Sequence, residues 1–295
     1  MSPKAIVLVT GALILSACAT IPSRNDEATA GSETGAIGKL EALAARMPGR
    51  YGAARRLDEE SPGVQMTLSA RFGENSDLLL ELREERESRQ RGFILALERV
   101  GPSPFIPGRF IPLQSDGTAS ARGCRMRFRL RGDVISGETD PAQCRFGTGE
   151  QAVGLLKEIA LDGSQIVIAD QLSTPGGDAD AEPDILRLHR LGEFRGQVRV
   201  RDRDGSGWRT AERMAVDVGG RRFEPVDAAG MSLGILVGLD LIAGQQPGEP
   251  LLYLQVTEAR TGQVLGQSWG EPQAARIGLA LERVQVDLER RPPRR

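Results

Sequence analysis

The chain of 295 residues contains one histidine and three cysteines, and this scarcity excludes several kinds of active site. A structural zinc site takes four Cys or His ligands, which would use every such residue in the sequence. His189 is the sole histidine, so the sequence offers almost no residues from which to build a metal centre or a histidine-based catalytic triad. We therefore assign no metal ligand and no catalytic residue from the sequence.

Aromatic residues and lysines are also few. Eight Phe, two Tyr and two Trp make a small aromatic set for a cavity that stacks a conjugated ligand. Lysine occurs only at Lys4, Lys39 and Lys157, so arginine supplies most of the positive charge. The 38 basic residues nearly balance the 40 acidic ones, and the net charge is −2. Since a phosphate backbone selects a strongly basic face, this balance argues against nucleic acid as the main partner.

No stretch reaches the ~18 consecutive apolar residues that indicate a membrane-spanning helix. The N-terminus instead has an apolar run of 11 residues, Ala5 to Leu15, which has the length of a signal-peptide core. The run ends in Leu15-Ser16-Ala17-Cys18, which resembles the lipobox of bacterial lipoproteins. We predict a signal peptide over residues 1–17 and acylation of Cys18. The alternative is an ordinary secretory signal that contains a cysteine by chance.

The predicted anchor also predicts where the protein resides. Residues 18–37 are small and polar, as in a flexible tether between lipid and folded body. Ala19 follows the cysteine where an Asp would retain a lipoprotein in the inner membrane, so the outer membrane is favoured in a Gram-negative host. We expect a cell-envelope protein that faces the periplasm and is held to the lipid bilayer through acylated Cys18.

The two remaining cysteines, Cys124 and Cys144, would then lie in an oxidising compartment. Closing a loop of this length with a disulfide contributes about 3 kcal/mol in the chain-entropy model. We predict a Cys124–Cys144 disulfide. The alternative is a free thiol that acts as a nucleophile or accepts a bilin.

Apolar periodicity predicts one short helix followed by β-structure. Leu40, Leu43, Ala44 and Met47 have helical spacing, and Pro48-Gly49 ends the pattern. Beyond it, short alternating segments separated by turns favour a sandwich or a barrel. The strands expected in this part are residues 64–72, 77–82, 92–100, 126–131, 134–137, 155–161 and 165–170.

From residue 196 onward the pattern predicts a second β-rich unit. Hairpins are expected around Gly219-Gly220 and Thr261-Gly262. Residues 277–288 are expected to form a strand with a bulge or bend at Glu282-Arg283. The predicted domains are a signal peptide (1–17), a lipidated tether (18–37), a barrel (38–195), a β-rich C-terminal domain (196–290) and a disordered basic tail (291–295).

Several motifs between residues 43 and 195 occur in a recognisable order. They are Met47-Pro48-Gly49-Arg50-Tyr51, Arg89-Gln90-Arg91-Gly92-Phe93-Ile94-Leu95, Gly123-Cys124, Ile135-Ser136-Gly137-Glu138-Thr139-Asp140-Pro141, Cys144 and Gly192-Glu193-Phe194-Arg195. In their order and spacing these motifs resemble the phycobiliprotein chromophore lyases of the CpcT/CpeT type. The resemblance covers about half of the chain. It implies an all-β, calycin-like antiparallel barrel, related in architecture to the lipocalins and preceded by a short helix.

The resemblance also implies a ligand and the residues that bind it. Members of the family bind a bilin, a linear tetrapyrrole, and join it to a protein cysteine. Arginine forks bind carboxylates in pairs of hydrogen bonds, so Arg89 and Arg91, with Gln90 between them, suit the propionates of such a ligand. Glu81 suits its pyrrole nitrogens. Tyr51, in the first motif, completes the predicted site.

Three functions therefore stay open. The first is an envelope-anchored lipoprotein whose barrel binds a small apolar or tetrapyrrole-like ligand. The second is a true lyase that attaches a bilin to a protein cysteine. The third is a structural or interaction lipoprotein whose barrel is filled by its own side chains and whose partner is another envelope protein.

Overall fold

A computed structural model describes most of the chain from Glu33 onward, and the described residues belong to one compact unit. The described ranges are residues 33–59, 63–75, 77–84, 92–98, 105–149, 152–173, 182–202, 204–244 and 249–292. The predicted signal peptide, the tether and Cys18 lie outside them, as do Arg89, Gln90 and Arg91. Within these ranges, no helix has the length and apolar character needed to cross a membrane.

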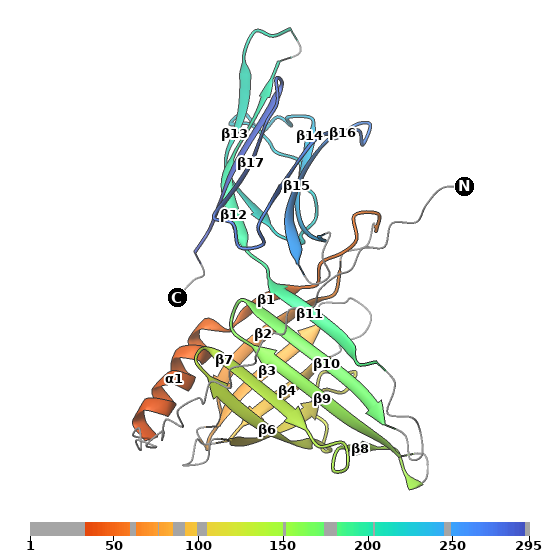
Figure 1. The fold of residues 1–295 in the computed structure, drawn as a ribbon. Coiled ribbons are helices and arrows are strands. Elements are labelled where there is room, and N and C mark those ends of the chain that lie inside the picture. The colour runs from red at the N-terminus through yellow and green to blue at the C-terminus, as the bar shows by residue number, and fades with distance from the viewer. Residues whose placement is uncertain are drawn as a thin grey trace, which may run out of the picture. The chain divides into compact units, whose positions relative to one another are not determined.

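A short helix and a closed antiparallel β-barrel make up the first part (Figure 1). The elements are α1 (Glu33–Arg46), β1 (Gly49–Gly52), β2 (Gln65–Phe72), β3 (Leu78–Glu84), β4 (Gly92–Leu97), β5 (Ile106–Pro112), β6 (Cys124–Arg131), β7 (Val134–Thr139), β8 (Arg145–Phe146), β9 (Val153–Leu161), β10 (Gln165–Ser173) and β11 (Asp184–Arg190). The strand order is β10-β11-β1-β2-β3-β4-β5-β6-β7-β9, and pairing of β9 with β10 closes the ring. The predicted all-β chain with an antiparallel barrel after a short helix is therefore confirmed.

Alternation of side chains gives the barrel an apolar core. Leu78, Leu80 and Leu82 on β3 are buried, whereas the residues between them are partly exposed. This period of two is the signature of a strand with one face on a core. Phe128, on β6, is fully buried and packs against the glycine positions of β5 and β7, where a Cβ atom would meet its ring. Gly108 and Gly137 therefore make room for the Phe128 ring.

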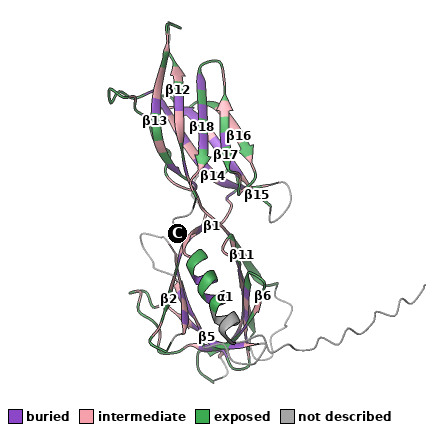
Figure 2. Ribbon diagram, turned by 90° about the vertical axis from the view of Figure 1, so that its left-hand side faces the viewer, coloured by how far each residue is buried: buried purple, intermediate pink, exposed green. Residues whose placement is uncertain are grey.

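Helix α1 lies across one end of the barrel (Figure 2). Its buried face contains Leu40, Leu43 and Ala44, which join the barrel core. The last carbonyls of a helix lack partners within it. Here the Arg190 guanidinium donates to the Arg46 carbonyl at 2.5 Å and to the Pro48 carbonyl at 2.6 Å. The helix end is thereby attached to the end of β11.

A seven-stranded β-sandwich forms the second part. Its strands are β12 (Glu193–Arg201), β13 (Trp208–Asp217), β14 (Ile235–Ala243), β15 (Pro250–Glu258), β16 (Val264–Gly270), β17 (Arg276–Ala280) and β18 (Val284–Arg290). One sheet has the order β13-β12-β18-β17 and the other β14-β15-β16. Their facing side chains form a second core, in which Phe194, Leu252 and Leu254 are fully buried.

Two local predictions for this part are wrong, and one is confirmed. The hairpin at Thr261-Gly262 joins β15 to β16 as predicted. No hairpin forms at Gly219-Gly220, because β13 pairs with β12 and the following segment makes only isolated bridges, such as Phe223 with Val237. At Glu282-Arg283 the chain makes a hairpin between β17 and β18 rather than a bulge within one strand.

Candidate functional site inside the barrel

A lysine is buried inside the barrel. On β9 the side chains of Leu155, Lys157 and Ile159, at every second position, are buried inside the barrel. Lys157 is 4% exposed. Its ammonium lies 5.1 Å from the centroid of the Phe93 ring and 5.0 Å from that of Phe110. Such distances are within the range of cation–π attraction, so two inward rings from β4 and β5 partly compensate the buried charge.

The carboxylate of Asp170 pairs with this lysine. Asp170 lies directly opposite Lys157 in the β9–β10 register. The Lys157 Nζ donates to Asp170 Oδ1 at 2.5 Å and to Oδ2 at 2.8 Å. The two side chains differ in exposure, because that of Lys157 is 6% exposed and that of Asp170 41%. The pair thus has a buried positive end and a carboxylate that reaches solvent.

Burial and pairing act on the lysine in opposite directions. Removal from water disfavours a charged group, and this burial lowers the pKa of Lys157 below its ordinary value. The hydrogen bond and the charge of Asp170 oppose that fall in pKa. The carboxylate is therefore the group that keeps an ammonium stable at this depth in the barrel.

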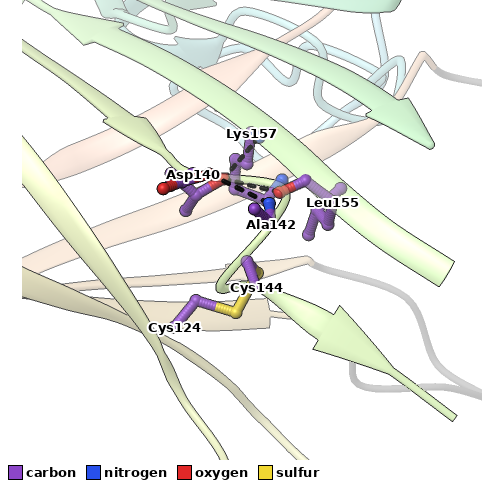
Figure 3. Close-up of a disulfide and its surroundings, with 7 residues drawn as sticks. Cys124, Asp140, Ala142, Cys144, Leu155 and Lys157 are labelled. Carbon is purple, nitrogen blue, oxygen red and sulfur yellow. Dashed lines mark hydrogen bonds between the residues drawn. A yellow bond between two sulfur atoms is a disulfide. The ribbon is translucent and has the colours of Figure 1, made fainter. Parts of the chain in front are cut away.

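The predicted disulfide is confirmed, and it lies next to this pair. Cys124 at the start of β6 is bonded to Cys144, and their Cα atoms are 5.0 Å apart (Figure 3). The Leu155 amide donates to the Cys144 carbonyl at 2.8 Å. The Thr139 hydroxyl donates to the Leu155 carbonyl and accepts from the Lys157 amide, both at 2.8 Å. The disulfide and Thr139 together fix β9 at the position of the lysine.

We call Lys157, Asp170, Phe93, Phe110 and Thr139 the Lys157 site. The site lies away from α1. Strand β9 ends at Leu161, and it is the turn after β9 that contacts the end of the helix. In that turn the Gly163 carbonyl accepts a hydrogen bond from Arg190. None of the five was predicted as a site residue, and Phe93 and Thr139 were noted only within the lyase-like motifs. The available signal was a lysine on the apolar face of an alternating strand.

Of the residues predicted for ligand binding, the structure describes Tyr51 and Glu81, and it places these two apart. Tyr51 is fully buried at the α1 end, where its hydroxyl donates to the Met47 carbonyl at 2.7 Å and to the Gly163 carbonyl at 3.2 Å. Burial raises the pKa of Tyr51 to about 12. Glu81 lies on the opposite face of β3 from the core leucines and pairs with Arg83. The structure does not bring Tyr51 and Glu81 together.

Comparison of the chain with protein-family models, with curated proteins and with solved structures finds no match. Among the residues that the structure describes, no three His, Cys, Asp or Glu side chains gather as a group that could hold a metal ion. The function of the chain is therefore inferred from its own geometry.

Proposed function

We propose that this chain is an envelope-anchored lipoprotein whose barrel binds a small, largely apolar ligand with N–H donors, as in a tetrapyrrole-like molecule. The observation that carries the proposal is the ion pair of Lys157 and Asp170 inside the barrel. Desolvation offsets most of the attraction in such a pair, so a barrel that served only as a scaffold would gain little from it. A binding role would explain why the barrel contains this ion pair.

In this proposal Asp170 contacts the ligand and Lys157 positions Asp170. The carboxylate is the exposed member of the pair, and each of its oxygens keeps a second lone pair for another donor. Hydrogen bonds to an ionised carboxylate are stronger than neutral ones. Leu172 is on the same side of β10, two residues further on, and is 62% exposed. It would supply apolar contact beside the carboxylate.

The test uses the mature body, residues 19–295, purified from the periplasm without its lipid. Calorimetric titration with biliverdin, haem and palmitate compares the wild type with Asp170→Asn. A charged hydrogen bond is worth about 1.5–3 kcal/mol, so we expect biliverdin affinity to fall about tenfold or more. Glu158→Gln, an exposed carboxylate on the outer side of β9, is the matched control and should bind as the wild type does.

Two results would contradict the proposal. The first is that none of the three probes binds the wild type. The second is that both variants lose affinity equally. Circular dichroism of each variant shows whether a loss of binding reflects a loss of fold.

The anchor is tested separately. Cys18→Ser removes the thiol that would be acylated, and we expect the protein to move from the membrane fraction to the soluble periplasm. Retention of the variant in the membrane would exclude Cys18 as the lipid attachment site.

The α1 half of the barrel favours a second candidate, an interaction lipoprotein with a filled barrel. Leu68, Leu188 and Tyr51 are fully or almost fully buried there, in the same core as the helix. Failure of all three probes would support this candidate. If biliverdin binds, an assay of bilin transfer to an acceptor cysteine tests the remaining alternative, a chromophore lyase of the CpcT/CpeT type.

A further inference from the structure

The outer face of the β14-β15-β16 sheet bears a row of aromatic and polar side chains. The strand register places Asp240, Tyr253 and Trp269 side by side on three successive strands. The Tyr253 and Trp269 rings are 5.9 Å apart and tilted by 39°. Trp269 is 52% exposed. The indole thus has half of its surface in water and is supported from one side by a tyrosine.

The neighbouring row is formed by amides. Gly238, Gln255 and Gln267 lie opposite one another on the same three strands. Gly238 has no side chain, and the stem of Arg222 occupies the space that a Cβ atom would fill. We call Asp240, Tyr253, Gln255, Gln267 and Trp269 the Trp269 face. A pocket of about 650 Å³ opens beside it, lined in part by Tyr253, Gln255 and Asp240.

Hydrogen-bonding capacity on this face is unused. The Gln255 amide nitrogen donates to the Tyr253 hydroxyl at 2.9 Å, which leaves the phenolic proton available for another acceptor. Two side-chain oxygens of the described residues are buried without a partner, and both are on this side of β15: Gln255 Oε1 and Thr257 Oγ1. Buried polar atoms are normally satisfied, so each such exception calls for an explanation.

The pocket is lined by equal numbers of positive and negative side chains, and hydrogen bonds hold one pair of them in place. The Arg55 guanidinium donates from Nε and from one Nη to Asp240 Oδ2, at 2.9 and 2.7 Å. Asp240 Oδ1 is the other acceptor of a carboxylate held in place. The remaining charged lining residues are Arg221, Arg222, Asp58 and Glu59, two of each sign. A pocket with no net charge favours a neutral ligand over an anion.

We propose that the Trp269 face binds a neutral oligosaccharide. A sugar ring presents a face of C–H groups, which suits the electron-rich face of an exposed indole. Its edge presents hydroxyls that both donate and accept, and these match Asp240 Oδ1, the Tyr253 proton and the Gln255 oxygen. In this proposal the Arg222 side chain, which also lines the pocket, moves aside so that the buried Gln255 oxygen can meet the sugar. This site lies in the sandwich and does not depend on the function proposed for the barrel.

The test measures whether residues 19–295 bind a hexasaccharide supplied at millimolar concentration. The four hexasaccharides are cellohexaose, chitohexaose, laminarihexaose and maltohexaose. We expect at least one to bind, and Trp269→Ala to weaken it about tenfold. Trp208→Ala is the matched control, since Trp208 is 42% exposed on β13 of the other sheet. Gln255→Ala should also weaken binding while leaving the exposed indole in place.

Two outcomes would overturn the proposal: no hexasaccharide binds the wild type, or Trp208→Ala and Trp269→Ala weaken binding to the same extent. Quenching of tryptophan fluorescence in a Trp208→Phe background reports Trp269 alone. A bound sugar that leaves this signal unchanged would also contradict the assignment.

Discussion

The barrel and the sandwich place their buried polar groups on opposite sides of their sheets. Inside the barrel, Lys157 and Thr139 lie among apolar side chains. The core of the sandwich consists entirely of apolar residues in the part of the chain that the structure describes. The buried polar residues associated with it, Thr257 and Arg55, lie outside that core. The barrel therefore has its buried polar groups within its core, and the sandwich has them outside its core.

This difference has a structural reason. A closed barrel surrounds an interior charge with many strands, so a carboxylate and two rings reach Lys157 from β10, β4 and β5. A sandwich interior is a thin layer between two sheets, and a polar group there would meet only apolar side chains from the opposite sheet. The barrel core can hold a charge because it also supplies the carboxylate and the rings that stabilise the charge.

The largest expected effect comes from placing a lysine in the sandwich core. Leu254 is fully buried on β15, and Leu254→Lys would bury an ammonium with no carboxylate near it. We expect a loss of about 5 kcal/mol of unfolding free energy. Leu254→Met, of similar volume, should cost less than about 1.5 kcal/mol. Urea unfolding followed by tryptophan fluorescence measures this, since Trp208 and Trp269 are both in the sandwich. Equal stability of the two variants would refute the comparison.

Removal of the disulfide should affect the barrel and spare the sandwich. Replacing both Cys124 and Cys144 by Ala releases a loop of about 20 residues, and the expected cost is about 3 kcal/mol. Amide hydrogen exchange should rise in β6 and β9, while the tryptophan transition of the sandwich stays unchanged. A uniform rise of exchange in both parts would show that the disulfide does not act locally.

Burial raises the pKa of both tyrosines, and the shift of Tyr51 is the larger, so the two should respond to alkali to different extents. The pKa of Tyr51 is raised from 10.0 to about 12, so its contribution to stability is fully present below pH 10 and is lost as the pH rises through 12. The loss amounts to slightly less than 3 kcal/mol. Tyr51→Phe should abolish this part of the alkaline destabilisation, and Tyr253→Phe should retain it. Urea unfolding between pH 9 and pH 12 gives the answer, and identical slopes for both variants would contradict it.

Breaking the ion pair should have the smallest of these effects. Asp170→Asn leaves the Lys157 ammonium without its carboxylate, but the lysine can lose its proton and Asp170 is partly screened by solvent. We expect a cost of about 2 kcal/mol. The double variant Lys157→Met, Asp170→Leu removes both charges and should recover stability to within about 1 kcal/mol of the wild type. A double variant less stable than Asp170→Asn would argue that the pair stabilises the barrel.

Local patterns predicted most of the fold, and they failed where pairing is long-range. The apolar run at 77–82 and the alternation at 126–131 predicted strands, which the structure confirms as β3 and β6. Strand β5 was not predicted, because Pro107 and Pro112 interrupt its pattern. The segment after Gly219-Gly220 looked like the second arm of a hairpin, but β12 competes successfully for the edge of β13. No local sequence signal shows which of the two segments pairs with β13.

The Lys157 site could be predicted only in part. Alternation along β9 places Lys157 on the apolar face, and the turn at Asp162-Gly163 indicates that β10 lies beside it. The rings of Phe93 and Phe110 come from strands more than forty positions earlier in the sequence. Their contact with the lysine depends on how ten strands close into a ring. That closure is a property of the whole barrel and leaves no trace in a short window of sequence.

Native mass spectrometry of residues 19–295, isolated from the periplasm, tests whether the barrel binds a ligand. We expect a ligand bound at one copy per chain, or a one-to-one complex once biliverdin is added, and loss of that complex in Asp170→Asn. A bare protein mass that does not change with biliverdin, haem or palmitate would contradict it. The barrel would then be a filled scaffold.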